Sequence, residues 1–353
     1  MNSRKKTKPV FVGPVGIGGD NPVVIQSMTN TPTENIDATV AQIKALADAG
    51  CQIIRVALPH QKAVKAFRKV KEQSPIPVVA DIHFQASYAV AAIEAGADKV
   101  RINPGNIGGK EKVKLVVDAA RQAGIPIRIG VNSGSVEKDI LEKYGSPTPR
   151  ALLESALRYI AMMESFSFDT IVLSIKASDV LTTIDACRLL SEHCEYPQHI
   201  GITESGTVRT GTIRSSVGVG ALLAEGIGDT IRVSLSGDPV NEIYVAREVL
   251  KSLGLVSGPV VIACPTCSRT QIDVSSLAEK VEAMVAGITA PIKIAVMGCV
   301  VNGPGEAKEA DVGIAGGKDK GQVFVRGEPK ETVPYDRLLE VLEKYVREMV
   351  GSE

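Results

Sequence analysis

The feature that most constrains the fold is a regular alternation of short apolar runs and amphipathic segments between residues 23 and 253. The apolar runs are rich in Val and Ile and are too short for helices, so each predicts a buried strand. Eight such runs occur, at residues 23–27, 53–58, 77–82, 99–103, 127–132, 170–175, 198–203 and 230–234. The intervening segments carry apolar residues three and four apart, which predicts helices packed on a sheet.

Eight strand–helix rounds in roughly 230 residues match an α/β chain that folds as a (β/α)8 TIM barrel, for which about 250 residues are typical. An open doubly wound sheet is the alternative, but it would carry a Gly-rich turn after the first strand, where this chain has Gln-Ser-Met-Thr at 26–29. We expect a short hairpin at 9–17 before the barrel, a barrel domain over 1–254, and a small α+β domain over 259–353. In the small domain we predict helices at 274–286 and 335–350, and a strand or hairpin near 312–315 and 323–326.

Composition excludes several classes of function. The 353 residues hold 40 basic and 40 acidic side chains, so nothing indicates binding to nucleic acid or to an acidic membrane surface. No apolar run is long enough to span a bilayer, and no apolar stretch of a signal peptide follows the basic start. Six cysteines in a chain of this length do not form a disulfide scaffold. We therefore expect a cytoplasmic protein.

Charged and polar residues fall at or near the carboxyl ends of the predicted strands, which converge on one mouth in a barrel. The cations among them are Arg55, Arg101, Arg128, Lys176 and Arg232, and the other polar candidates are Asp81, His83, Asn132, Glu204 and Ser234. One arginine alone would suggest a salt bridge, but five cations in one mouth require an anion. Arginine forks fit phosphate oxygens in pairs, so the mouth is predicted to hold a diphosphate. Asp81, His83 and Glu204 either orient these cations or transfer protons and hold substrate hydroxyls.

Three cysteines of the second domain lie near Gly and Pro turns, Cys264 and Cys267 two residues apart and Cys299 after an apolar run. This spacing presents thiolates to a soft metal centre. Three thiolates complete neither a zinc site nor an iron–sulfur cluster, so either one iron stays open to substrate or an oxygen ligand such as Glu306 completes the set. The alternatives are a structural zinc site with a distant fourth ligand, or cysteines of the core.

Four motifs resemble one family. They are Cys-Pro-Thr-Cys at 264–267, Gly-Cys-Val-Val-Asn-Gly-Pro-Gly-Glu at 298–306, Gln-Ser-Met-Thr at 26–29 and Ala-Asp-Ile-His-Phe at 80–84. Together they closely resemble the bacterial 4-hydroxy-3-methylbut-2-en-1-yl diphosphate synthases, iron–sulfur enzymes of the methylerythritol phosphate route to isoprenoids. The resemblance covers essentially the whole chain, with the short bacterial layout.

The resemblance implies a reductive ring opening of 2-C-methyl-D-erythritol 2,4-cyclodiphosphate with loss of water, using two electrons from flavodoxin or ferredoxin. It implies a 4Fe–4S cluster held by Cys264, Cys267, Cys299 and Glu306, with Asn302 reaching the substrate from the same loop. The five cations of the mouth, with Ser234 beside them, match the family's diphosphate site. Family members are similar head-to-tail homodimers in which one subunit's cluster domain closes over the other's barrel.

Two other classes of protein compete with this interpretation. Lys176 at the end of the sixth strand could form a Schiff base, as in phosphosugar aldolases, with a structural zinc in the second domain. A non-enzymatic electron-transfer module on a binding barrel is the other, but an open or Glu-bound iron and a cationic mouth favour an enzyme.

Overall fold

The computed structural model describes residues 3–299, 301, 305 and 308–351. The chain divides into two compact units, Met1–Leu255 and Val256–Glu353.

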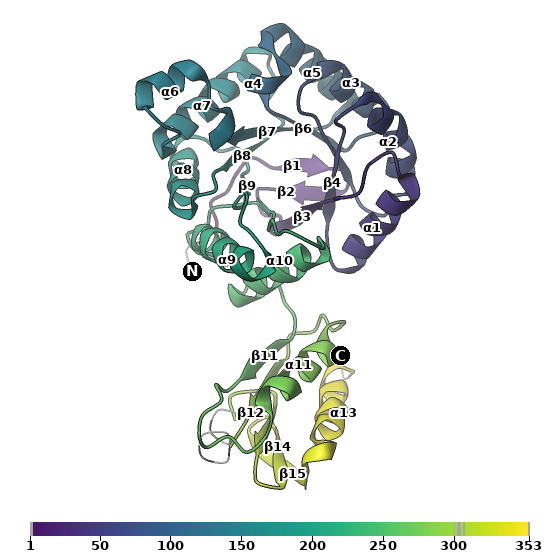
Figure 1. Cartoon of the computed structure of the whole chain (residues 1–353), viewed down its shortest axis with the longest axis vertical. Helices are drawn as coiled ribbons and strands as arrows, with labels where there is room; N and C mark the ends of the chain where they lie inside the picture. The colour runs from purple at the N-terminus through teal and green to yellow at the C-terminus, as the bar shows by residue number, and fades with distance from the viewer. Residues whose placement is uncertain (1–2, 300, 302–304, 306–307, 352–353) are drawn as a thin grey trace. The chain divides into compact units, whose positions relative to one another are not determined.

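The first unit is a parallel barrel ringed by helices, seen nearly along its axis in Figure 1. Its strands follow the order β8-β7-β6-β5-β4-β3-β10-β9, and a parallel bridge between Leu173 and Gln198 brings β8 against the start of β9 and nearly closes the ring. The strands are β3 (Val24–Met28), β4 (Ile53–Ala57), β5 (Val78–Asp81), β6 (Lys99–Ile102), β7 (Ile127–Asn132), β8 (Ile171–Lys176), β9 (His199–Ile200) and β10 (Thr230–Ile231). The predicted TIM barrel is therefore confirmed.

The helices follow the strands in alternation, as the apolar spacing predicts. They are α1 (Ile36–Asp48), α2 (Gln61–Gln73), α3 (Ala86–Glu94), α4 (Pro104–Ile107), α5 (Gly109–Ala123), α6 (Lys138–Tyr144), α7 (Pro149–Ser165), α8 (Val180–His193), α9 (Val208–Ala224) and α10 (Val240–Ser252). Local sequence sets their ends: Thr148 accepts a hydrogen bond from the Ala151 amide just before α7, and Pro149 occupies its first turn. Gly124 ends α5 in the left-handed conformation that favours glycine.

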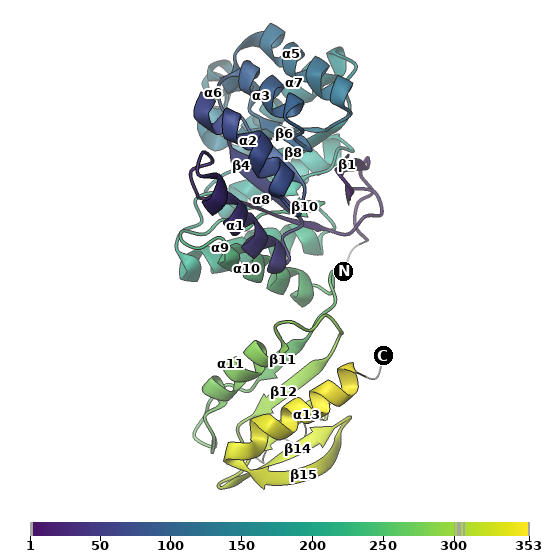
Figure 2. The same cartoon turned by 90° about the vertical axis from the view of Figure 1, so that its right-hand side faces the viewer.

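A two-stranded hairpin, β1 (Val10–Val12) and β2 (Val15–Ile17), closes the amino end of the barrel. Its buried side chains Val10, Val12 and Ile17 pack on residues at or near the starts of barrel strands, among them Val24 and Ile53. The hairpin lies at one end of the ring in Figure 2. The opposite, carboxyl end of the strands is thus the open one, where a site belongs.

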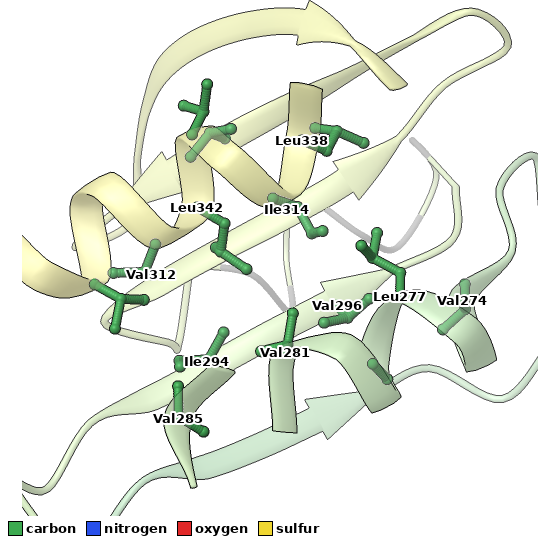
Figure 3. Close-up of a cluster of buried hydrophobic side chains, with 14 of the residues drawn as sticks. Val274, Leu277, Val281, Val285, Ile294, Val296, Val312, Ile314, Leu338 and Leu342 are labelled. Atoms are coloured by element: carbon green, nitrogen blue, oxygen red, sulfur yellow. The ribbon is translucent and has the colours of Figure 1, made fainter. Parts of the chain in front are cut away.

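Within the described residues, the second unit is a five-stranded mixed sheet with two helices on one face. Strands β11 (Val260–Ala263), β12 (Lys293–Met297) and β13 (Val312–Gly316) are parallel, and β14 (Lys320–Val325) and β15 (Glu328–Pro334) continue the sheet antiparallel. Helices α11 (Val274–Val285) and α13 (Leu338–Val350) cover it. Figure 3 shows their apolar side chains, such as Val281 and Leu342, meeting Ile294 and Ile314 of the central strands.

Several details differ from the sequence-based expectation, and one of them is strand β11, which was not predicted. Strands β9 and β10 are only two residues long, since the chain leaves the ladder soon after Ile200 and Ile231. The strand β15 was not predicted, because its sequence Glu-Pro-Lys-Glu-Thr-Val-Pro is mostly polar and exposed, as suits a sheet edge. The last helix begins at Leu338, after a short 3-10 turn over Tyr335–Arg337.

Candidate active site

A buried carboxylate at the end of β5 organises the mouth of the barrel. Asp81 is 2% exposed, and its two oxygens lie 3.1 Å from Nη1 of Arg101 and 3.5 Å from Nε of Arg55. His83 Nε2 lies 3.9 Å from the same carboxylate. Burial alone would raise the pKa of Asp81, but the two arginines outweigh it and hold that pKa at about 2. Asp81 is therefore a fixed negative charge that positions guanidinium groups from two neighbouring strands.

A second buried carboxylate, Glu242 on α10, holds Arg232. Its oxygens accept hydrogen bonds from Nη2 and Nε of Arg232 at 3.2 and 3.3 Å. The Ser27 hydroxyl and the Leu235 amide donate to the same carboxylate at 2.8 and 3.1 Å. Between the two acidic centres, the Met28 sulfur accepts from Arg55 Nη2 at 2.9 Å. Ser27 and Met28 of the Gln-Ser-Met-Thr motif thus help to align two arginines. Met28 contacts Arg55 directly, and Ser27 holds the carboxylate that binds Arg232.

Two further cations form no ion pair with a carboxylate among the described residues. Arg128 on β7 is 2% exposed, and its Nε and Nη1 atoms have no hydrogen-bond partner within the described residues. Burial, then repulsion from Arg55 and Arg101, lowers the pKa of Arg128 well below its ordinary value. Burial, then Arg128 and Arg232, likewise lowers the pKa of Lys176. Arginine keeps its positive charge in proteins. The lowered pKa values of Arg128 and Lys176 therefore mean that unpaired positive charge in the mouth costs free energy, and a bound anion would relieve that cost.

All five predicted cations therefore lie close enough to change one another's pKa values. Among the described residues, the carboxylates of Asp81 and Glu242 form ion pairs with three of them. Glycines make room for two of the long side chains. A Cβ at Gly130 would lie 2.9 Å from the Arg101 guanidinium, and one at Gly201 would lie 2.9 Å from the Lys176 amine. The mouth has a net positive charge, and its geometry suits a compact anion with several oxygens.

The remaining predicted residues lie at the end of β7 or in the segments after β9 and β10. Asn132 ends β7 in register with Lys176, and the Ser234 carbonyl accepts a hydrogen bond from the Ser205 hydroxyl. Glu204 is exposed after β9 and has a φ of 52°. A left-handed backbone is costly for glutamate and clusters at functional sites, so the structure adds a reason to single out Glu204.

Several buried charged groups of the barrel were not predicted from the sequence, among them Glu242 and Lys99. Lys99 opens β6 two residues before Arg101, so both side chains share the inner face of the strand. That alternation could have indicated Lys99. Glu242 gave no comparable signal, because it lies in the first turn of a helix where acidic residues are common.

In the second unit, the cysteines follow the carboxyl ends of adjacent parallel strands. Cys264 comes directly after β11, and Cys299 comes two residues after β12. The Cys264 amide donates to the Val296 carbonyl at 3.1 Å, and the Gly298 amide donates to the Cys264 sulfur at 3.1 Å. Cysteine sulfur that binds a metal commonly accepts such amide hydrogen bonds.

The loop after Cys264 is fastened to the backbone beside Cys299. The Cys267 amide donates to the Thr270 hydroxyl at 3.0 Å, and the Gln271 amide donates to the Gly298 carbonyl at 2.8 Å. A Cβ at Gly298 would lie 2.7 Å from a Val274 methyl, so the approach requires glycine. The donor set of thiols at one end of the sheet fits a soft metal centre.

Within the described ranges, no three His, Cys, Asp or Glu side chains are gathered closely enough to hold a metal ion. Asn302 and Glu306 lie outside the described residues. The predicted ligand set of Cys264, Cys267, Cys299 and Glu306 accordingly stays a prediction. By contrast, burial raises the pKa of Cys51 and Cys187 to about 12, which makes these thiols unreactive parts of the core.

Fold and site together define a TIM-barrel protein with an anion-binding mouth and a separate cysteine-bearing domain. The family model described as the GcpE TIM-barrel domain matches residues 7–247, and that of the GcpE protein C-terminal domain matches residues 260–348. The chain belongs to the GcpE family.

Two curated relatives cover nearly the whole chain. One from Caldanaerobacter subterraneus is 54% identical over 100% of both chains, and one from Bacillus subtilis is 55% identical over 98% of this chain and 92% of its own. Both are named 4-hydroxy-3-methylbut-2-en-1-yl diphosphate synthase (flavodoxin). Among solved structures, a Yersinia pestis dihydropteroate synthase aligns at a TM-score of 0.48 and 14% identity over 70% of this chain and 98% of its own, a likeness too low to bear on function. No helix in the described part of the chain is long and apolar enough to cross a membrane.

The charge state of Asp81 yields a stability prediction. Its folded pKa of about 2 lies below the ordinary 3.8, so its contribution to stability is complete above pH 3.8 and is lost as the pH falls through about 2. The shift corresponds to about 2 kcal/mol. Urea unfolding of Asp81→Asn should therefore show a lower free energy of unfolding at neutral pH and a weaker acid dependence than the parent. The exposed Asp48→Asn change should leave both unchanged, and an acid dependence of Asp81→Asn equal to the parent's would contradict this role.

Proposed function

We propose that this chain catalyses the reductive ring opening and dehydration of 2-C-methyl-D-erythritol 2,4-cyclodiphosphate to 4-hydroxy-3-methylbut-2-enyl diphosphate. In this reaction one C–O bond to the diphosphate breaks, one hydroxyl leaves as water, and the carbon skeleton gains two electrons. The observation that carries the proposal is the buried cation surplus in the mouth of a chain that belongs to the GcpE family. The Schiff-base aldolase alternative is not favoured, because the full-length relatives are named as this synthase.

The barrel residues bind and orient the diphosphate in this proposal. Arg128 and Lys176, which form no ion pair with a carboxylate in the described part of the chain, pair with phosphate oxygens. Asp81 keeps Arg55 and Arg101 aligned, and Glu242 keeps Arg232 aligned, so each guanidinium offers its remaining N–H groups to the ligand. His83, Asn132 and Ser234 supply further hydrogen bonds, and Glu204 moves a proton at a substrate hydroxyl.

The second domain would hold the electron-carrying group, a 4Fe–4S cluster bound by Cys264, Cys267, Cys299 and Glu306. When bound, such a cluster supplies single electrons and an iron that polarises a substrate oxygen. Asn302 would contact the substrate from the same loop. Flavodoxin stands in the relatives' names, and flavodoxin or ferredoxin would deliver the electrons here. We also propose the cytoplasm as the compartment, since thiolate ligands persist where disulfides are kept reduced.

The cluster is tested by composition. Anaerobically purified protein should contain about four irons and four sulfides per chain, with visible absorption that dithionite bleaches. Cys264→Ser should lose most of the iron and sulfide, whereas Cys194→Ser, which alters a cysteine of the barrel, should retain both. About one zinc per chain and no sulfide in an oxygen-free preparation would overturn the cluster.

The diphosphate site is tested by steady-state kinetics with the cyclodiphosphate. Arg128→Ala should raise KM about tenfold or more, since a lost charge-assisted contact costs about 1.5–3 kcal/mol. Arg150→Ala changes an exposed arginine at the start of α7 and should leave KM unaltered. If Arg128→Ala binds substrate as well as the parent does, Arg128 lies outside the diphosphate site.

A head-to-tail homodimer completes the proposal. Ile213 and Val217 are 60% and 55% exposed one turn apart on α9, and Tyr244 is 57% exposed on the neighbouring α10. Exposed apolar side chains on two neighbouring helices suit a protein interface, where they would be removed from water. These helices lie on the side of the ring away from α5 (Figure 1).

The shared active site is tested by mixing two inactive variants. Arg128→Ala spoils the barrel site and Cys264→Ser spoils the cluster domain, so a mixed dimer keeps one intact pair only if each site combines two subunits. After subunits exchange, equal amounts should regain about a quarter of parental activity, since half of the dimers are mixed and each has one working site. No recovery in a mixture shown to contain mixed dimers would mean that each subunit acts alone.

A further inference from the structure

Four buried polar side chains from four strands lie inside the barrel with polar atoms that lack partners. We call this set the polar floor: Gln26 of β3, Lys99 of β6, Arg128 of β7 and His199 of β9, each at most 2% exposed. Their unpartnered atoms, within the described part of the chain, are both amide atoms of Gln26, Nζ of Lys99, Nε and Nη1 of Arg128, and Nε2 of His199. In most TIM barrels branched aliphatic residues dominate this space. Unpaired buried polar groups are costly, so the floor is retained for a reason other than packing.

Lys99 is the member whose position is most informative. It is fully buried and lies two residues before Arg101 on the same face of β6, about 7 Å deeper along the strand. Burial, then Arg128 and Arg55, lowers the pKa of its amine well below the ordinary 10.5. Without an added anion, the amine therefore gives up its proton far more readily than an exposed lysine does.

The charges around Lys99 come from every strand of the site. The basic groups are Arg55 of β4, Arg101 of β6, Arg128 of β7, Lys176 of β8 and Arg232 after β10. The pKa of His199 of β9 is lowered by burial, then by Arg128, Lys176, Lys99 and Arg55. The acidic groups are Asp81 and Glu242, and each already pairs with arginines. No carboxylate in the described residues pairs with Lys99 in an ion pair.

We propose that Lys99 is a positioning residue for the diphosphate, a buried amine that takes up a proton when the ligand enters the mouth above it. This inference rests on the proposed function and goes beyond it, because it assigns a role to a residue that need not touch the substrate. A cyclic diphosphate brings two negative charges to the mouth, and nearby opposite charge favours the ammonium form of a lysine.

The same residue would match the charge that the reaction creates. When the ring opens, the phosphate oxygen released from carbon becomes a terminal oxygen, and the diphosphate gains a third negative charge. A proton already held on Lys99 would stabilise that charge from below, without leaving the protein. Lys99 thus supplies a positive charge only when the ligand is bound, and its position in the barrel is fixed.

The pH dependence has a definite sign. Because binding takes up a proton, affinity for the cyclodiphosphate must weaken as the pH rises through the range between the amine's free and bound pKa values. Over that range, each pH unit should weaken binding up to tenfold for one proton taken up. Each phosphate of the cyclic ligand is a strong acid that stays ionised and takes up no proton near neutrality, so protons taken up on binding must go to the protein.

Calorimetry without reductant measures this directly. Anaerobic full-length protein is titrated with the cyclodiphosphate between about pH 6 and pH 9, in two buffers with different heats of ionisation. The difference in heat gives the number of protons taken up. Lys99→Met should take up about one proton fewer than the parent and bind at least tenfold more weakly at neutral pH. Lys99→Arg, a permanent cation, should bind well with the same loss of proton uptake.

Two controls make the result decisive. Lys62→Met removes an exposed lysine on α2 and should match the parent in affinity and proton count. Thermal unfolding should show Lys99→Met at least as stable as the parent, because an unpaired buried amine is replaced by an apolar group of similar length. If Lys99→Met fails to fold, Lys99→Arg carries the test. An unchanged proton count in the folded variants overturns the role of Lys99 alone, whereas parent protein that does not bind the cyclodiphosphate overturns the proposed function and this inference together.

Discussion

The geometry of the barrel mouth depends on one buried carboxylate, Asp81, between two guanidinium groups. Removing Asp81, Arg55 and Arg101 from water is costly, and each is compensated by the others. Glu242 and Arg232 repeat the arrangement next to the end of β10. Because these two acids align only part of the positive charge, the site retains attraction for an anion while its arginines stay fixed in orientation.

Sequence reasoning went furthest where a rule of topology applied. Strand ends converge in a barrel, so residues as distant as Arg55 and Arg232 could be assigned to one mouth before any coordinates. The same rule missed Lys99, because it directs attention to the carboxyl end of β6 and Lys99 opens that strand. It missed Glu242 because helix residues follow no such rule, and the ion pair with Arg232 is a long-range contact that no local pattern encodes.

The second domain shows the complementary limit. Its helices and central strands followed from apolar spacing, but the two edge strands β11 and β15 did not. The exposed polar sequence of β15 joins the sheet through pairing with β14 rather than through burial. The backbone contacts that join the loop of Cys264 and Cys267 to Gly298 were equally invisible in the sequence. The motif resemblance implied roles for Asn302 and Glu306, of which the residue pattern alone suggested only Glu306 as a ligand.

The hairpin at the amino end of the barrel also has a kinetic meaning. With Val10, Val12 and Ile17 packed against the starts of the strands, that end is sealed by a hydrophobic plug. Substrate and product must then both pass through the open carboxyl end of the barrel. A product that keeps its diphosphate cannot leave through the amino end of the barrel while substrate enters at the carboxyl end. Product must therefore dissociate before the next substrate binds. Accumulated product would therefore compete with substrate for the same open end of the barrel. The rate of turnover would then depend on how fast the cations of the mouth release the diphosphate of the product.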